Sequence, residues 1–426
     1  MRILVLTRSA WRNDNSTGRT VSDIMSAFPD AEIYSLSMRE QKMQNDISKE
    51  NFIISEKQII KRLLGKGTVG KRESASNILT SEKADIYDND AVKSRKILWF
   101  FREFLWCVGG WKNKHLKKYI DDVKPDIIFS PIFPGCYPQK VLLYLKKLSG
   151  AKVAIFHMDD NYTLKRYSLS PLYWIFRFYM RGWVKKSTKC ADIVYVISEL
   201  QKREYEKCFK RECKLLTKSA DFSVEPNIKN EYSKPLELIY TGNIALNRWK
   251  SLARIANVLE KINVDGVKAQ LKIYTGNRVT EEMNVALNKE NTSFVMGSVT
   301  ADQVKEIQNR ADVLVHIEPT DLKNRLLVRQ SFSTKIVDYL AAARPILAFG
   351  PKDVASIDHL IKHDCAIVAD NEDELYSNLI EVIENKNKLE SLALKAYECG
   401  KKNHNKSDID SMLIEDFGRL IKLKGV

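Results

Sequence analysis

The residues best suited to chemistry lie between positions 318 and 345, in a stretch that starts with Glu318. Ser333, Thr334 and Lys335 are predicted to begin a helix, where free backbone N–H groups and the helix dipole attract anions. Asp338 follows one turn later and can accept hydrogen bonds from the two hydroxyl groups of a ribose. This order of hydroxyl, cation and carboxylate predicts a binding site for a phosphorylated nucleoside.

A second group of binding residues is predicted after a strand that ends at Thr241. Gly242 and Asn243 follow this strand, and Arg248 and Lys250 lie in the helix that comes next. Arginine can engage two phosphate oxygens and lysine supplies a point charge, so the pair suits a diphosphate. The alternative is that both are solvated surface charges.

In the N-terminal half, the predicted strand over residues 152–156 runs directly into His157-Met158-Asp159-Asp160. Parallel sheets bind their ligands at the carboxyl ends of strands, so His157, Asp159 and Asp160 are candidate catalytic residues, acting as a general base on a hydroxyl group. The alternative is that the aspartates only cap turns. The first strand is likewise followed by a polar loop containing Gly18, which predicts an anion or sugar site or, alternatively, a simple helix cap.

No metal site is expected from the sequence. Asp88-Asn89-Asp90 has the letters of a cation-binding Asp-x-Asp motif, but it lies in a polar stretch rather than after a strand. His359 and His363 are four residues apart and lack a third ligand at a telling distance, so they are interpreted as surface histidines. The seven cysteines form no C-x-x-C pair, which predicts free thiols.

The elements that must position these residues are strands alternating with helices in both halves of the chain. This pattern predicts an α/β protein with two doubly wound, Rossmann-like parallel-sheet domains that face a central cleft. The N-terminal domain is placed at 1–215, the C-terminal domain at 235–400, and a final helix at 405–426 that could pack back on the first domain. Residues 40–95 contain no confident strand and are predicted to be a mobile insertion. The clearest strands are expected at 2–7, 127–130, 152–156, 193–197, 237–241, 271–275, 293–296, 313–317, 345–349 and 366–369.

Length and composition fit this organisation. A chain of 426 residues with 44% hydrophobic residues can bury two cores, which excludes a single small module and a disordered chain. The net charge of +15 favours nucleic acid, an anionic membrane face or a phosphorylated substrate without choosing among them. A short apolar N-terminus and the lack of a run of about 18 apolar residues predict a cytoplasmic location, with membrane contact only at the inner surface.

The stretch around Gln330 and Asp338 resembles the retaining GT-B glycosyltransferases known as glycosyl transferases group 1, of the family 4-like type found in bacterial polysaccharide biosynthesis. These two residues are eight apart, as are the two acids of that family's Glu-x7-Glu motif, and Ala343-Arg344-Pro345 occupies the position of its Gly-x-Pro turn. The resemblance implies that Asp338 holds the ribose and that position 330, here glutamine, contacts the donor sugar. The resemblance also extends to Gly242-Asn243 with Arg248 and Lys250, to the loop at His157, and to the loop before Gly18. It therefore covers nearly the whole chain apart from residues 40–120.

The resemblance implies transfer of a sugar from a nucleotide-diphosphate donor to a hydroxyl of a glycan or lipid-linked acceptor, in cell-surface polysaccharide or glycoconjugate assembly. No cofactor and no metal are expected, because arginine, lysines and helix N-termini can hold the leaving diphosphate. A nucleotide-sugar epimerase on the same fold is an alternative. A basic protein that binds nucleic acid is another, but no RNA-binding module or zinc-finger pattern supports it.

Two basic segments in the N-terminal half are rich in aromatic residues, at positions 93–118 and 164–189. The second contains no acidic residue. Helices that mix aromatic rings with cations suit the headgroup layer of an anionic membrane. The alternative is that the rings pack the core of the domain while the cations are solvated.

Overall fold

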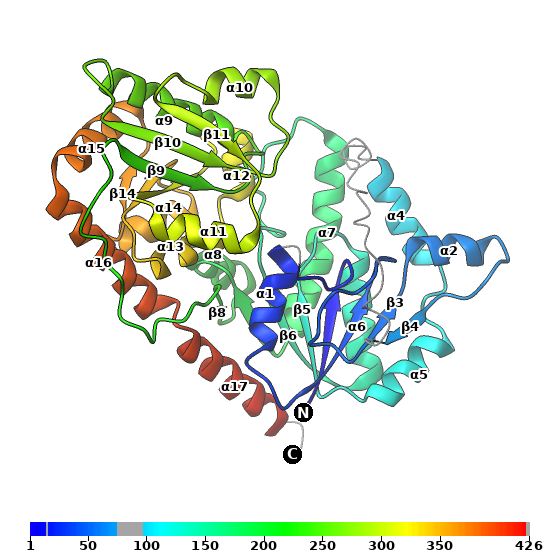
Figure 1. The fold of residues 1–426 in the computed structure, drawn as a ribbon. Coiled ribbons are helices and arrows are strands. Elements are labelled where there is room, and N and C mark those ends of the chain that lie inside the picture. The colour runs from blue at the N-terminus through cyan, green and yellow to red at the C-terminus, as the bar shows by residue number, and fades with distance from the viewer. Residues whose placement is uncertain (14–15, 75–96, 423–426) are drawn as a thin grey trace.

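The computed structural model describes residues 1–13, 16–74 and 97–422, and it contains two α/β domains (Figure 1). An eight-stranded sheet forms the centre of the N-terminal domain and a six-stranded sheet forms the centre of the C-terminal domain. The predicted fold class, two doubly wound parallel-sheet domains, is confirmed. Each strand expected from the sequence is present, with ends that move by at most two residues.

In the N-terminal sheet the strand order is β4-β3-β2-β1-β5-β6-β7-β8. All neighbouring strands are parallel except β3 and β4, which pair antiparallel at the edge. The central strands are apolar on both faces, as parallel strands covered by helices on both sides must be. The strands are β1 (Arg2–Thr7), β2 (Glu32–Ser37), β3 (Glu50–Ile53), β4 (Lys71–Ser74), β5 (Ile127–Pro131), β6 (Lys152–His157), β7 (Ile193–Val196) and β8 (Lys214–Leu215).

Helices cover both faces of this sheet. Side chains of alternate strand residues, such as Ile3 and Val5, pack with α1 (Ser16–Met25) and α17 (Lys406–Lys422). The intervening residues, such as Leu4 and Leu6, pack on the other face. The helices on that second face are α2 (Glu56–Leu63), α4 (Ile97–Val108), α5 (Lys114–Val123), α6 (Tyr137–Ser149), α7 (Pro171–Cys190) and α8 (Glu199–Phe209).

The expectation that residues 40–95 contain no strand is wrong. β3 pairs with β2 through residues such as Phe52, which is buried, and α2 begins at a capping box made by Ser55 and Gln58. β4 is a short polar edge strand, and such strands lack the apolar alternation that identifies a strand in a sequence. Residues 75–95 of this stretch lie outside the described part of the chain.

The C-terminal sheet has the strand order β11-β10-β9-β12-β13-β14, and all its pairs are parallel. Its strands are β9 (Leu236–Thr241), β10 (Ala269–Tyr274), β11 (Ser293–Gly297), β12 (Val313–Ile317), β13 (Ile346–Phe349) and β14 (Ile367–Ala369). One face packs on α9 (Arg248–Ile262), α10 (Glu281–Leu287) and α15 (Glu372–Glu384). The other face packs on α11 (Ala301–Arg310), α13 (Thr334–Ala341), α14 (Ala355–Lys362) and α16 (Lys386–Asn403).

The chain passes between the domains twice. Residues 216–235 connect the sheets without helix or strand, and the chain then returns where α16 ends and α17 begins. α17 lies along the N-terminal domain (Figure 1), where the Tyr195 hydroxyl donates to Asp416 at 2.9 Å and the Phe417 ring stacks on Phe28 at 4.7 Å between centroids. The C-terminal helix therefore belongs to the N-terminal domain in space.

The seven cysteines are free thiols, as predicted. Within the described ranges, no helix combines the length and apolar character needed to cross a membrane.

Candidate functional site

Two adjoining cavities lie between the domains, with volumes of about 580 Å³ and about 250 Å³. Helix α1 of the N-terminal domain forms one wall of both. Loops at the carboxyl ends of the C-terminal strands form the opposite wall, together with the start of α13. The residues that line both cavities are Ser16, Thr20, Asn243, Thr334 and Lys335.

Lys335 is the cation that the two cavities share. Its ammonium group lies over Gly242, where an added Cβ would be 2.1 Å from Nζ, so a side chain at this position would displace the ammonium group. Gly242 also has a φ of 145°, a conformation that favours glycine. Lys335 Nζ donates to the Tyr240 hydroxyl at 3.3 Å and lies 4.6 Å from the centre of the Tyr240 ring. Burial and the nearby Arg248 guanidinium lower the pKa of Lys335 to about 8, which an anionic ligand would reverse.

Arg248 forms part of the smaller cavity and is held by a buried acid. α9 begins at Arg248, immediately after Asn247 in a left-handed conformation. Arg248 Nη2 donates to Glu318 Oε2 at 2.9 Å, and Glu318 Oε1 lies 3.4 Å from His316 Nε2. Although burial raises the pKa of Glu318, His316 and Arg248 bring it below its usual value. Glu318 therefore stays ionised and orients the guanidinium group, whose other N–H groups are available to a ligand.

Asp338 lines the larger cavity on the opposite side of Lys335. Its carboxylate pairs with Lys218, which comes from the segment between the domains. Asp23 of α1 lies on the facing wall and accepts a hydrogen bond from Ser219 Oγ at 3.0 Å. Residues of three separate parts of the chain, Asp23, Lys218 and Asp338, thus line the same cavity.

The far end of the larger cavity is formed by the loops after β10 and β11 and by α11. Gln308 of α11 is buried and donates to Thr241 Oγ1 at 2.8 Å, which fixes it against the end of β9. This end combines one aromatic side chain with several polar groups, a composition that suits a flat heterocycle. Its lining residues are Tyr274, Thr275, Gly276, Ser298, Val299, Val304 and Gln308.

Most of the residues predicted for donor binding come together here. Gly242, Asn243, Thr334, Lys335 and Asp338 line the larger cavity. The smaller cavity is lined in addition by Asp159, Arg248, Glu318 and Ser333. Five other predicted residues, His157, Asp160, Gln330, Lys250 and Gly18, line neither cavity.

The structure gives no support to a catalytic role for His157. Its side chain is fully buried between Tyr205 and Phe209, and its Nε2 lies 3.2 Å from Thr188 Oγ1. Burial lowers the pKa of His157 to about 3, so the imidazole is neutral at physiological pH. It belongs to the hydrophobic face of the sheet rather than to the cleft.

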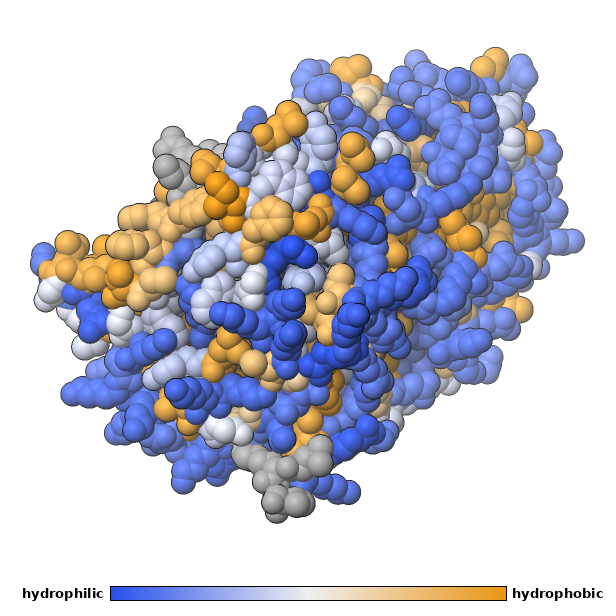
Figure 2. All heavy atoms as spheres, turned by 180° about the vertical axis from the view of Figure 1, so that it is seen from behind, coloured by the Kyte–Doolittle hydropathy of each residue, from blue (hydrophilic) through white to orange (hydrophobic). Residues whose placement is uncertain are grey.

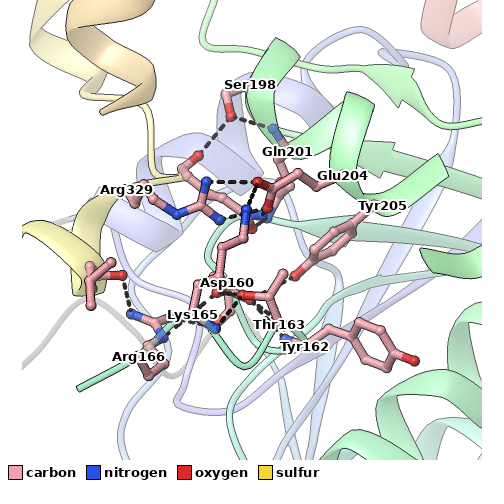
Figure 3. A network of polar contacts seen from close by, with 12 residues as sticks. Asp160, Tyr162, Thr163, Lys165, Arg166, Ser198, Gln201, Glu204, Tyr205 and Arg329 are labelled. Atoms are coloured by element: carbon pink, nitrogen blue, oxygen red, sulfur yellow. Dashed lines mark hydrogen bonds and ion pairs between the residues drawn. The ribbon is translucent and has the colours of Figure 1, made fainter. Parts of the chain in front are cut away.

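Asp160 is also held inside the N-terminal domain (Figure 3). Its carboxylate lies 3.3 Å from Arg177 and 3.8 Å from Arg166, and it accepts hydrogen bonds from the backbone and hydroxyl of Thr163. Burial works to raise the pKa of Asp160, but the two arginines and Thr163 lower it below its usual value. Of the three predicted catalytic residues, only Asp159 reaches a cavity, where its carboxylate accepts from Ser331 Oγ at 2.7 Å.

Gln330 is fully buried and points toward the N-terminal domain instead of the cavity. Its side-chain amide donates to Glu204 of α8, and its backbone oxygen accepts from Ser198 at 2.7 Å. Arg329 binds the same Glu204 carboxylate through two hydrogen bonds of 2.8 and 2.6 Å (Figure 3). Burial opposes ionisation, yet hydrogen bonds from Arg329, Lys165 and Gln330 lower the pKa of Glu204 to about 2. Gln330 therefore helps to join the domains, and this geometry does not place it on a donor sugar.

Lys250 and Gly18 have other surroundings. Lys250 is exposed and lies 5.3 Å from the centre of the Trp249 ring, on the outside of α9. Gly18 is buried in α1, and an added Cβ would be 1.8 Å from the backbone oxygen of Arg12. The glycine thus allows the preceding loop to approach the helix, which brings Ser16 and Thr20 to the cavities.

The interpretation of His359 and His363 as surface residues is wrong. Both are only partly exposed, and the His359 imidazole lies 3.3 Å from that of His404, where α16 ends. No group of three or more histidine, cysteine or acidic side chains suited to a metal ion occurs in the described ranges. Asp88-Asn89-Asp90 lies outside them.

No protein-family model and no curated protein matches the sequence. The fold, however, is similar over the whole chain to solved GT-B glycosyltransferases. Sucrose-phosphate synthase of Thermosynechococcus elongatus has a TM-score of 0.63 at 12% identity, covering 99% of this chain and 100% of that chain. HepE of Anabaena in complex with UDP has a TM-score of 0.64 at 12% identity, covering 98% and 100%. The α,α-trehalose-phosphate synthase (UDP-forming) of Burkholderia xenovorans, in complex with glucose-6-phosphate, has a TM-score of 0.60 at 9% identity, covering 98% and 100%. The fold of this chain is thus GT-B.

Proposed function

We propose that this protein is a glycosyltransferase that moves a sugar from a nucleotide-diphosphate donor to an acceptor hydroxyl. The observation that carries the proposal is the convergence of Arg248, Lys335 and Asp338 on two joined cavities between the domains. The solved structures similar in fold include complexes with UDP and UDP-glucose, which agrees with a nucleotide-sugar donor.

The donor is expected to lie along the C-terminal wall. Its base occupies the end formed by the loops after β10 and β11, and its ribose hydroxyls bind Asp338 after the carboxylate exchanges Lys218 for them. The diphosphate lies over Gly242, between Lys335, Arg248 and the N-terminus of α13. These groups stabilise the negative charge that builds on the diphosphate as the bond to the sugar breaks.

The sugar and the acceptor are expected in the smaller cavity. Asp159 faces it from the N-terminal domain and Arg248 faces it from the C-terminal domain. In the transfer, the bond between the anomeric carbon and the diphosphate oxygen breaks, the acceptor oxygen forms the new bond to that carbon, and the acceptor proton passes to the departing diphosphate oxygen. We assign Asp159 to binding the acceptor hydroxyl, because among the described residues it is the carboxylate that this wall presents.

The finer parts of the proposal follow from the family resemblance. We propose that transfer proceeds with retention, that no cofactor or metal takes part because side-chain cations neutralise the diphosphate, and that the product belongs to a cell-surface polysaccharide or glycoconjugate. A glycan or lipid-linked acceptor fits this role. A nucleotide-sugar epimerase would use the same donor site, and a release of free nucleoside diphosphate during turnover distinguishes the transferase from it.

A thermal-shift panel of UDP-, GDP-, ADP- and dTDP-sugars tests the donor site. A donor that binds the folded protein raises its melting temperature by an amount that grows with the logarithm of its concentration relative to its dissociation constant. We expect one nucleotide class to respond, and we expect Asp338→Ala to weaken its binding at least about tenfold, since the carboxylate makes charged hydrogen bonds.

Asp265→Ala is the matched control, because Asp265 is an exposed residue of the same domain outside both cavities. It should keep the full shift. A responding donor that shifts Asp338→Ala as strongly as the unaltered protein would show that the ribose assignment is wrong. If no nucleotide sugar shifts the unaltered protein, the proposed function itself is wrong.

A further inference from the structure

Helices α4 and α7 carry apolar side chains on their outer as well as their inner faces. On α4, Phe101, Phe104 and Val108 follow one exposed stripe, with Phe104 60% exposed. On α7, Ile175 is 57% exposed and its neighbours on the same face are also apolar. Apolar helix faces are normally buried, and the exposed fractions of these side chains show that no described part of the chain covers the outer faces.

The inner faces account for only part of the aromatic content of these segments. Trp106 and Trp111 are buried in the core of the domain, as are Met180 and Val184 of α7. The prediction that the aromatic residues form core is thus right for the inner faces. The outer faces remain to be explained.

The exposed side chains join into one band along the edge of the N-terminal domain. Figure 2 shows it as an apolar strip on the left of that view, running over α2, α4 and the start of α7. Leu169, in the loop before α7, is 87% exposed. We define the apolar band as Leu63, Leu64, Phe101, Phe104, Val108, Leu169, Leu172, Ile175, Phe178 and Tyr179.

Basic side chains border the band, and exposed acids are lacking on its two main helices. α7 contains no acidic residue, and the acid of α4, Glu103, is buried and accepts from the backbone of Cys136 at 2.6 Å. A cavity of about 550 Å³ opens beside the band and is lined by Lys112, Lys140 and Lys147 together with Leu143, Tyr144, Leu148 and Trp183.

This basic cavity is continuous with the band. Lys140 Nζ lies 3.1 Å from Cys107 Sγ near the end of α4, and 5.7 Å from the ring centre of Tyr179 on α7. Lysines held against aromatic rings beside an apolar surface can meet a phosphate while the rings contact aliphatic chains.

We propose that the apolar band is a docking surface for an anionic lipid bilayer, with its side chains at the boundary between headgroups and acyl chains and the adjacent lysines on lipid phosphates. The charge of the surrounding side chains favours a bilayer over a second copy of the chain as the partner of the apolar band. A two-fold dimer through the band would place the same lysine-rich borders against each other, and like charges repel. An anionic bilayer supplies the opposite charge. This inference does not depend on the proposed function.

The band also reaches the rim of the cleft. Arg166, in the loop before α7, donates to the backbone oxygens of Leu326 and Leu327 of α12 (Leu322–Val328) in the C-terminal domain. A protein docked through the band would therefore hold the cleft close to the bilayer surface, where a lipid-linked acceptor is found.

Co-sedimentation with phosphatidylcholine vesicles, with and without phosphatidylglycerol, tests the proposal. We expect binding only to vesicles that contain phosphatidylglycerol. Lys186 belongs to the same border, because its Nζ lies 4.5 Å from the ring centre of Trp183, which lines the basic cavity. Changing Lys112, Lys147 and Lys186 to glutamine should lower the partition coefficient about a hundredfold, since each cation near an anionic surface contributes about a factor of five. Changing Phe101, Phe104 and Phe178 to serine should lower it at least about tenfold.

Matched controls lie on the C-terminal domain, away from the band. Changing the exposed Lys261, Lys305 and Lys401 to glutamine removes the same net charge, and changing Val264 and Val285 to serine removes exposed apolar groups. Both controls should bind vesicles normally. Equal binding to neutral and anionic vesicles, an equal loss in the controls, or a dimer in analytical ultracentrifugation that the serine variant dissociates would each overturn the proposal.

Discussion

Each domain has a loop that follows the carboxyl end of a parallel strand and contains charged residues, and the charges of the two loops behave in opposite ways. In the N-terminal domain, His157 ends the strand β6 and Asp159 and Asp160 follow it. In the C-terminal domain, His316 lies in the strand β12 and Glu318 follows that strand. In the first loop Asp160 is neutralised by buried arginines and His157 is enclosed by aromatic rings. In the second, Glu318 holds an arginine whose other N–H groups face a cavity, beside a lysine with a lowered pKa.

The difference shows that a place at the carboxyl end of a parallel strand is not enough to make a charged residue functional. Asp160 has its counter-charges within its own domain, and it therefore fixes the loop and leaves only Asp159 to the cleft. Burial and Arg248 lower the pKa of Lys335 even though Glu318 and Asp338 act to raise it, so a ligand's negative charge would stabilise both cations. Three experiments would break or sharpen this comparison.

The largest effect is expected for Asp160→Ala. Because the arginine side chains that surround Asp160 are almost fully buried, their charges would be left unpaired, and the free energy of unfolding should fall by about 3–5 kcal/mol. Urea denaturation measures this loss. The folded fraction should keep kcat/KM within about threefold. If the alanine variant does not fold, Asp160→Asn, which preserves the shape of the side chain, can be measured in its place. A large fall in kcat with little loss of stability in either variant would show that Asp160 has a catalytic role.

Lys335→Met tests the other loop and should have the opposite signature. Loss of a cation aimed at the leaving diphosphate should lower kcat/KM by about 10²–10³-fold. The melting temperature at neutral pH should rise, because the folded state disfavours the charged lysine, as its lowered pKa indicates. Lys250 lies two residues after Arg248 but outside both cavities. Lys250→Met should change kcat/KM by no more than about twofold and should leave the melting temperature nearly unchanged. Similar losses in the two variants would contradict the distinction between them.

The smallest effect concerns pH. The pKa of Lys335 is about 8 in the free protein and is expected to rise when a diphosphate binds. Donor affinity should therefore be constant below about pH 8 and fall by about tenfold per pH unit above it, as the free protein loses the proton that the complex retains. Calorimetric titration across this range measures the slope. A Lys335→Met variant should show no such slope, and an unchanged slope in that variant would assign the titration to another group.

The sequence predicted all the strands of the C-terminal sheet and the central strands of the N-terminal sheet, together with the C-terminal wall, because these depend on local signals. Gly242 follows a buried strand, Arg248 and Lys335 lie at the start of helices, and Asp338 is one turn further on, so their positions in the fold are fixed by the pattern around them. The same pattern named Asp159 in the N-terminal domain. Glu318 was found for the same reason, although its role in orienting Arg248 appears only when the two are seen at 2.9 Å.

What the sequence could not predict depends on contacts between distant parts of the chain. Gln330 meets Glu204, which lies 126 residues earlier, and Lys218 reaches Asp338 from a segment that has no helix or strand. Neither residue stands in a periodic pattern. Asp23 faces the site only because α1 packs on the edge of the cleft. For β3 and β4 the cause was different, since edge strands with polar residues resemble loops.

The two passages of the chain between the domains limit how the halves can move. A single tether would permit swivelling in any direction, but two tethers, one at residues 216–235 and one before α17, define an axis. The backbone of Ala220 bonds both ways to the second tether, donating to His404 and accepting from Lys406, so the tethers are fastened to each other. Relative motion of the two domains is then limited to a hinge-like rotation about this junction. Such a rotation would return the two walls of the cleft to the same alignment each time.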